Sequence, residues 1–179
     1  MESNQNQTAT ATSRSPETQI ETQKITTFLW FDQNAEEAVN FYTSVFKNSK
    51  IRDVARYGES GPGAKGDVMI IEFELDGQQF IALNAGPQFK FTEAISLLVH
   101  CQTQEEVDYY WTRLTADGGQ EVECGWLKDK FGLSWQVTPT ILDKLMADKD
   151  PEKAKRVMET MLQLDKLDIE PLQRAYEGQ

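Results

Sequence analysis

Residues 27–42 read TFLWFDQNAEEAVNFY and residues 96–111 read SLLVHCQTQEEVDYYW, which is one pattern written twice. When Glu37 is aligned with Glu106, the two apolar runs and the two acidic helix starts superimpose without a gap. A duplication of this length indicates two fused copies of one supersecondary unit. We therefore expect a binding site where the two copies meet.

The first copy predicts the element order β-α-β-β-β. Its helix begins after Asn34, a good N-cap residue, with acidic residues in the first turn. Asp76-Gly77 is a strong signal for a tight hairpin between two strands. The strands are rich in β-branched and aromatic residues or alternate in polarity, and are expected at 25–31, 51–57, 67–75 and 79–84.

The second copy repeats the first strand and helix at 95–101 and 103–116, and strands follow at 120–124 and 133–138. Beyond Pro139 the pattern becomes helical, and Pro151 opens one of these helices. The expected organisation is a tail at 1–23, a two-module domain at 24–138 and a helical extension at 139–179. Module one is expected at about residues 24–92 and module two at about residues 93–138.

Composition excludes several classes of partner. The formal net charge of −11 and the pI of about 4.6 disfavour contact with nucleic acid or anionic membranes. The sequence contains no apolar run long enough for a membrane span and no apolar core of a signal peptide. Cys101 and Cys124 are too few for a disulfide framework. We therefore expect a cytoplasmic protein with reduced thiols and a polar, disordered tail at 1–23.

Taken together, these residues resemble the vicinal oxygen chelate superfamily of glyoxalase, bleomycin-resistance and dioxygenase proteins. Within it they are most similar to the PhnB-like branch, often labelled 3-demethylubiquinone-9 3-methyltransferase-like. The resemblance implies an α+β fold of paired βαβββ modules whose sheets curl into a half-open cup, followed by C-terminal helices. The matching stretches are LWFD at 29–32, AEEAVNFY at 35–42, FELDG at 73–77, NAGP at 84–87, FKF at 89–91, CGWLKDKFGLSWQ at 124–136 and DPEKA at 150–154.

In the best-known members of the superfamily, four protein ligands in the cup hold one divalent metal ion. Counting from the helix starts, these ligand positions fall on Thr27, near Ala82, on Ser96 and on Gln136. This set offers no imidazole and no carboxylate, whereas a divalent ion needs several such ligands. The single histidine, His100, falls beside these positions and is interpreted as a strand-end residue. We therefore expect no metal and no other cofactor.

Five residues are candidates for binding a ligand, while no catalytic residue can be named: Trp30, Asn84, Trp126, Trp135 and Gln136. Gln136 is the best of them, because an amide among apolar neighbours needs a partner if it is buried. Gly125 before Trp126 and Lys128-Asp129 after it suggest a loop at the mouth of the cup.

Each of these candidates also has a structural interpretation. Trp126 and Trp135 could line the cup or fill the core, as could Phe28 and Trp30 on the first strand. Asn84 could cap a turn rather than contact a ligand. Cys124 has no histidine nearby to act as a base, which favours a structural thiol over a nucleophile.

Three functions remain open at this point. The first is a binding protein that holds a small molecule in an aromatic cup without metal. The second is a metal-dependent lyase, isomerase or dioxygenase, which requires a different ligand register. The third is the methyltransferase that the family label suggests, but the chain lacks the glycine-rich loop of that class. Because a second chain often completes half-open cups in this superfamily, we also expect a C₂ homodimer.

Overall fold

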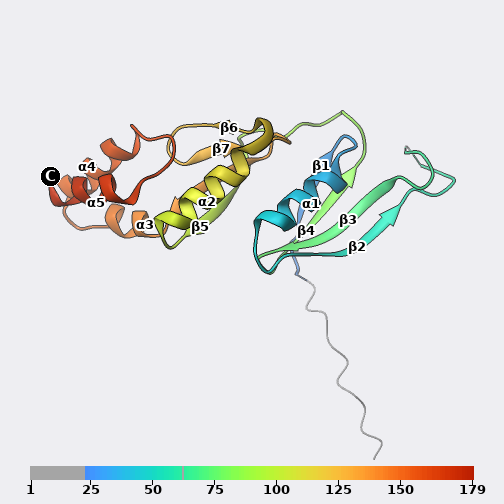
Figure 1. Cartoon of the computed structure of the whole chain (residues 1–179), viewed down its shortest axis with the longest axis horizontal. Helices are drawn as coiled ribbons and strands as arrows, with labels where there is room; N and C mark the ends of the chain where they lie inside the picture. Colours follow the sequence, from blue (N-terminus) through green and yellow to red (C-terminus); the bar gives the residue numbers. More distant parts are fainter. Residues whose placement is uncertain (1–22, 62) are drawn as a thin grey trace, which may run out of the picture.

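The computed structural model describes residues 23–61 and 63–179, so the predicted tail at 1–23 lies outside the described residues except for Gln23. Two βαβββ modules lie side by side, and a helical extension follows at the far end of the second module (Figure 1). The α+β architecture of paired modules with C-terminal helices is thereby confirmed. In the described part of the chain, no helix is long and apolar enough to cross a membrane.

Module one contains one helix and a four-stranded sheet in the order β1-β4-β3-β2. Strand β1 is parallel to β4, and the other neighbours are antiparallel. The observed bounds lie within two residues of the expected ones: β1 Thr27–Phe31, α1 Ala35–Val45, β2 Lys50–Arg56, β3 Val68–Leu75 and β4 Gln78–Asn84.

Module two repeats this arrangement with the strand order β5-β8-β7-β6. Its elements are β5 Ser96–Cys101, α2 Gln104–Thr115, the 3₁₀ turn η1 Ala116–Gly118, β6 Gln120–Glu121, β7 Trp126–Lys128 and β8 Ser134–Pro139. The expected strand at 120–124 is wrong in its length. It ends at Glu121, because the chain turns at Cys124, whose φ is +60°. The short strand β7 then begins after this turn and was not predicted.

The alignment of the two copies without a gap is correct for the helices and wrong for the strands. It pairs Leu29, which is buried, with Leu98, which is 47% exposed. In β5 the residues that pack on the core are instead Leu97 and Val99. Three residues separate β1 from α1, but only two separate β5 from α2. Since side chains alternate along a strand, this one-residue difference moves every aligned strand position to the opposite face.

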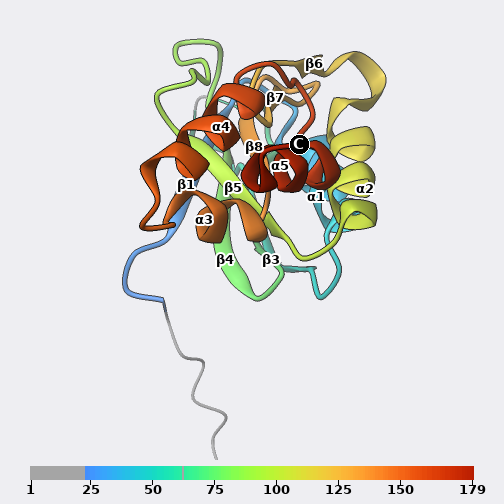
Figure 2. The same ribbon diagram turned by 90° about the vertical axis from the view of Figure 1, so that its left-hand side faces the viewer.

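The extension folds as three helices with a small core of their own, which gather at one end of the molecule (Figure 2). These are α3 Ile141–Met146, α4 Pro151–Met161 and α5 Ile169–Glu177. Asp150 and Asp168 cap the starts of α4 and α5 by accepting hydrogen bonds from the backbone two residues later.

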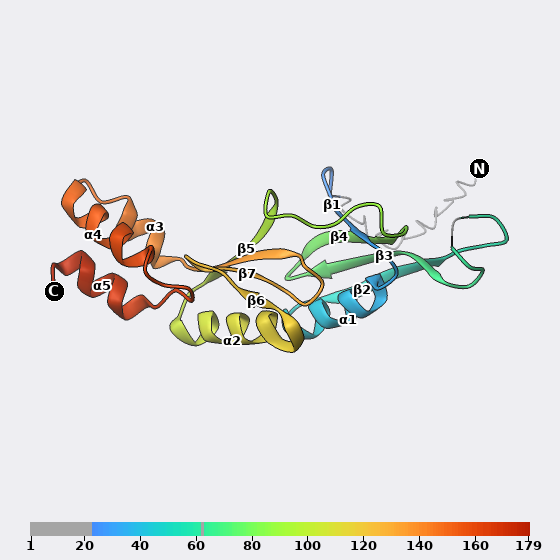
Figure 3. The ribbon, with the colours of Figure 1, turned by 90° about the horizontal axis from the view of Figure 1, so that it is seen from above.

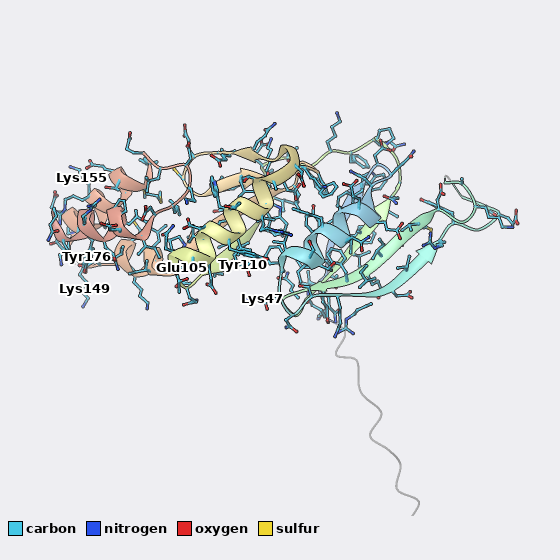
Figure 4. The ribbon with its side chains drawn as sticks, viewed as in Figure 1. Lys47, Glu105, Tyr110, Lys149, Lys155 and Tyr176 are labelled. Carbon is cyan, nitrogen blue, oxygen red and sulfur yellow. The ribbon has the colours of Figure 1, made fainter. Side chains whose placement is uncertain are left out.

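An aromatic cluster joins the two modules into one core. The ring of Trp135 from β8 stacks on Phe46 at 5.3 Å and lies 5.6 Å from Tyr42 on α1. Tyr110, which is labelled on α2 in Figure 4, also stacks on Phe46, with ring centroids 5.1 Å apart. These rings come from both modules, so the modules share a single hydrophobic core.

Candidate functional site

The helices α1 and α2 cover the same side of the molecule, and the opposite sides of both sheets are left open (Figure 3). We call these surfaces the open faces. On module one the open face includes Phe28, Trp30, Ile70, Glu72, Ile81 and Leu83; on module two it includes Ser96, Leu98, His100, Trp126, Gln136 and Thr138. The assignment follows from strand alternation, since the intervening residues pack against the helices.

The open face of module two brings together two predicted site residues. Strand pairing places Gln136 between Trp126 on β7 and Leu98 on β5. The Gln136 amide nitrogen donates a hydrogen bond to the Ser96 hydroxyl, with 2.8 Å between Nε2 and Oγ. The result is a half-buried amide flanked by an indole and an exposed aliphatic side chain.

The open face of module one is aromatic and aliphatic near the end of β1. Trp30 lies in one row with Leu83 and Ile70 across the sheet. Its indole N–H donates to the Gly86 carbonyl, at 2.9 Å, which fixes the orientation of the ring. Phe28 lies two residues before Trp30 on β1 and is 51% exposed, so in the single chain it is not part of the hydrophobic core.

Trp135, another predicted site residue, lies on the helix side of β8 and is 2% exposed. Its indole N–H donates to Asp129 Oδ2 at 2.8 Å. The structure therefore separates Trp135 from Gln136, its neighbour in sequence, because adjacent strand residues point to opposite faces. Trp135 fills the core and does not reach the open face.

Asn84 is also buried and holds the end of β4 in place. Its Oδ1 accepts a hydrogen bond from the Ala35 backbone at the start of α1, at 2.9 Å, and its amide donates to the Val68 carbonyl at 3.1 Å. This is the capping role that was the structural alternative for Asn84. The backbone carbonyl oxygen of Asn84 accepts a further hydrogen bond from the Tyr57 hydroxyl, at 2.5 Å.

Asp129 is a buried carboxylate that sequence reasoning assigned to a loop at the cup's mouth. It is 3% exposed and accepts four hydrogen bonds. Its Oδ2 receives the Tyr42 hydroxyl and the Trp135 indole N–H, each at 2.8 Å. Its Oδ1 receives the backbone N–H groups of Phe131 and Leu133, at 2.8 and 3.1 Å. Asp129 therefore fastens the β7–β8 turn of module two to the helix α1 of module one.

Burial raises the pKa of Asp129 above its usual value, although the hydrogen bonds from Trp135 and Tyr42 oppose the shift. Burial, followed by the charge of Asp129, raises the pKa of Tyr42 well above its usual value. In the folded state Asp129 thus binds a proton more readily than in the unfolded state. Its contribution to stability is therefore greatest below the usual carboxyl pKa and declines as the pH rises through the raised pKa.

This gives a prediction for the pH dependence of stability. The difference in free energy of unfolding between the wild type and Asp129→Asn should narrow as the pH rises from about 4 towards neutrality. Urea unfolding of both proteins over this range measures the difference, and the other titrating groups cancel because they are common to both. A difference that widens with pH would mean that the four hydrogen bonds lower the pKa of Asp129 more than burial raises it.

The metal-ligand positions inferred from the family do not fit a divalent ion. Thr27 and Ala82 lie on the helix side of their strands, and only Ser96 and Gln136 reach an open face. None of the four carries an imidazole or carboxylate, which such an ion requires. Within residues 23–61 and 63–179, no three histidine, cysteine or acidic side chains cluster in a way that could hold a metal ion.

Two cavities border the sheets. The first, about 460 Å³, lies where module one meets module two, between the end of β1, the linker at 85–95 and the β7–β8 turn. We call it the junction pocket. Trp30 lines it, together with Phe89, Phe131, Lys90, Lys128 and Lys130. The second cavity, about 700 Å³, lies at the end of module one beside Asn84, Arg56 and Tyr57. Trp126, Trp135 and Gln136 line neither cavity.

Paired βαβββ modules with open sheet faces define a protein of the vicinal oxygen chelate fold. The chain belongs to the family described as 3-demethylubiquinone-9 3-methyltransferase, which matches residues 23–138. This family forms the PhnB-like branch of the superfamily.

Solved structures support both levels of this assignment. A putative 3-demethylubiquinone-9 3-methyltransferase, PhnB protein, from Bacillus cereus is 45% identical, with a TM-score of 0.61, over 66% of this chain and all of its own length. The PA1353 protein of Pseudomonas aeruginosa is 19% identical, with a TM-score of 0.56, over 66% of this chain and 98% of its own, and shows the fold alone. None of the curated proteins matches this chain.

Proposed function

We propose that this protein binds a small organic molecule on the open faces of its sheets, without the metal ion common in its superfamily. The observation that supports this most is the pairing of Gln136 with Trp126 on the open face of module two. An amide beside an indole can orient a ligand by one hydrogen bond while the ring supplies apolar contact.

The hydrogen-bonding state of Gln136 defines part of the ligand's chemistry. Its amide nitrogen already donates to Ser96. Its carbonyl oxygen has no hydrogen-bond partner among the described residues, and the side chain is half-exposed. A carbonyl oxygen only accepts. The ligand should therefore present an N–H or O–H group next to an apolar ring or chain.

We further propose that a second copy of the chain covers the open faces. Phe28 and Leu98, one on the open face of each module, are 51 and 47% exposed, although large apolar side chains are usually buried. A C₂ dimer would bury these side chains and could place one module of each chain around a shared cup. The ligand would then lie between chains.

The alternative is a metal-dependent lyase, isomerase or dioxygenase. It would need ligands outside the four family positions, since those residues do not fit a divalent ion. Methyl transfer, which the family description names, is not proposed, because the described fold contains no alternating α/β unit with a glycine-rich loop for S-adenosylmethionine. Equilibrium dialysis with labelled S-adenosylmethionine tests that function directly.

Native mass spectrometry of the tag-free protein tests binding and assembly together. We expect a mass of twice the 20.4 kDa chain, with or without an organic adduct, and no divalent ion. One metal ion per chain that chelator removes would overturn the metal-free proposal and favour the enzyme. A single-chain mass would overturn the dimer.

A pair of variants locates the dimer interface. Phe28→Glu places a charge on the open face of module one and should shift the mass to that of one chain. Leu162→Glu makes the same change at the C-cap of α4, where the side chain is 54% exposed, and should leave the dimer intact. A dimer that survives Phe28→Glu, or dissociates with Leu162→Glu, would place the interface elsewhere.

A further inference from the structure

We propose that the junction pocket is a separate binding site for a planar aromatic molecule that carries one carboxylate or a comparable anionic group. Its volume of about 460 Å³ lies within the range of pockets that bind small molecules. The pocket lies outside the proposed cup on module two, since neither Gln136 nor Trp126 lines it. Trp30 lies both in this pocket and on the open face of module one, so the two sites are tested separately through Gln136 for the cup and Phe89 for the pocket.

One side of the junction pocket is aromatic. Phe89, on the linker between the modules, stands edge-on to Trp30 with ring centroids 4.9 Å apart. Phe89 is 66% exposed although it is held in this contact. Phe131 lines the pocket from the β7–β8 turn of the other module. Rings presented in this way offer faces and edges to a further flat ring.

The other side is basic, and its counter-ions are more exposed to solvent than the lysines they pair with. The side chains of Lys128 and Lys130 are only 27 and 22% exposed, whereas their partners Glu93 and Glu37 are 61 and 64% exposed. An ion pair with an exposed carboxylate contributes little to stability. Glu93 and Glu37 can therefore turn into solvent when a ligand anion replaces them, while the lysines stay in place.

Lys130 is further fixed by aromatic contacts. Its ammonium nitrogen lies 5.1 Å from the centre of the Phe131 ring and 5.4 Å from that of Phe41. Lys90 lines the same pocket, is exposed, and has no ion-pair partner within residues 23–61 and 63–179. Lys90 can therefore bind a ligand anion without breaking an existing ion pair.

The charge of the lining matches a ligand with one negative charge. Three lysines and two aspartates, Asp32 and Asp129, line the pocket, which leaves one net positive charge in the lining once Glu93 and Glu37 have turned into solvent. Asp129 accepts hydrogen bonds from four internal donors, so both of its oxygens are engaged. A neutral ring would leave Lys90 without a counter-charge, and a multiply charged anion would be repelled by the two aspartates.

Nuclear magnetic resonance titration of the ¹⁵N-labelled full chain with 1-naphthoate tests this site. We expect saturable shifts at the amides of residues 89–91 and 128–132. Because the anion and the rings both contribute, Lys128→Met and Phe89→Ala should each weaken binding about five-fold or more. Naphthalene-1-carboxamide, which has the same shape without the charge, should bind weaker by a similar factor.

Matched variants separate this site from the rest of the molecule. Lys47→Met removes an exposed lysine at the opposite end of α1 (Figure 4), and Phe28→Ala removes an exposed ring on the open face. Both should leave the affinity unchanged. No saturable shift up to about 5 mM, equal affinity for the carboxamide, or a loss of binding in Phe28→Ala instead of Phe89→Ala would each overturn the proposal.

Discussion

Asp129→Ala is expected to destabilise the protein by about 3–5 kcal/mol, a large part of the total stability of an ordinary domain. The substitution removes one carboxylate and leaves four donors without their acceptor. These are the Tyr42 hydroxyl, the Trp135 indole N–H and the backbone N–H groups of Phe131 and Leu133. Each buried donor left unsatisfied costs about 1–3 kcal/mol, and the costs are not additive. Urea denaturation followed by circular dichroism measures the loss.

Two companion variants show whether the loss comes from this network. Tyr42→Phe removes one of the four donors together with its hydrogen bond, and should cost about 1 kcal/mol. Asp143→Ala removes an exposed carboxylate on α3, and should change stability by less than about 0.5 kcal/mol. A loss for Asp129→Ala no greater than that for Tyr42→Phe would mean that water replaces the missing acceptor.

Apart from β7, the order of elements could be predicted from the sequence, because apolar alternation and helix-start residues are local signals. The helix starts at Asn34 and Thr103, the Asp76-Gly77 hairpin and the helical extension beyond Pro139 all follow from such signals. The fold itself came from the resemblance to a known family. Neither source shows that the connection from β5 to α2 is one residue shorter than the connection from β1 to α1. The faces of β5 were therefore assigned wrongly.

The role of Asp129 was not predictable from its neighbours. Between Lys128 and Lys130 an aspartate is typical of a solvated turn. It is buried because Tyr42, from the other module, supplies a donor 87 residues away in sequence. The best signal was Gly132, which allows the tight turn that brings two backbone N–H groups back to the carboxylate.

The candidate site was only partly predictable for a similar reason. Alternation along the predicted strand at 133–138 separates Gln136 from Trp135. The pairing of Gln136 with Trp126 could not be predicted, because it depends on β7, which the sequence did not indicate. The junction pocket is formed by four segments of the chain: the end of β1, the linker, the η1–β6 segment and the β7–β8 turn. Its lysines become a group only when the two modules pack together.

The helical extension lies outside the region that the family matches, which ends at residue 138. It is nevertheless attached to a turn within that region. The backbone N–H groups of Cys124 and Gly125 donate to the carbonyls of Leu164 and Asp165, each at 2.7 Å. The Gln104 side chain on α2 adds hydrogen bonds with Leu167 and Ile169. The sequence interpretation placed Gly125 at the mouth of the cup, whereas it forms the joint with the extension.

Gly125→Ala is therefore expected to destabilise the protein by about 2–4 kcal/mol. At φ +82° any side chain is strained by about 1–2 kcal/mol. The added methyl group would also lie 2.9 Å from Leu167 Cδ1 and 3.0 Å from the Val137 carbonyl oxygen. Leu167 is 1% exposed in the core of the extension, so it has little room to move.

Gly132→Ala separates the two contributions to this loss. Gly132 has nearly the same backbone conformation, φ +85°, but nothing lies within 4 Å of its added methyl group. It should show the conformational cost alone, about 1–2 kcal/mol. The excess in Gly125→Ala is then the steric cost at the joint, and hydrogen exchange should report it as faster exchange in α3, α4 and α5 than in the strands of module two. Equal losses in the two variants, with no selective exchange in the extension, would mean that Leu167 shifts freely and that Gly125 does not hold the extension in place.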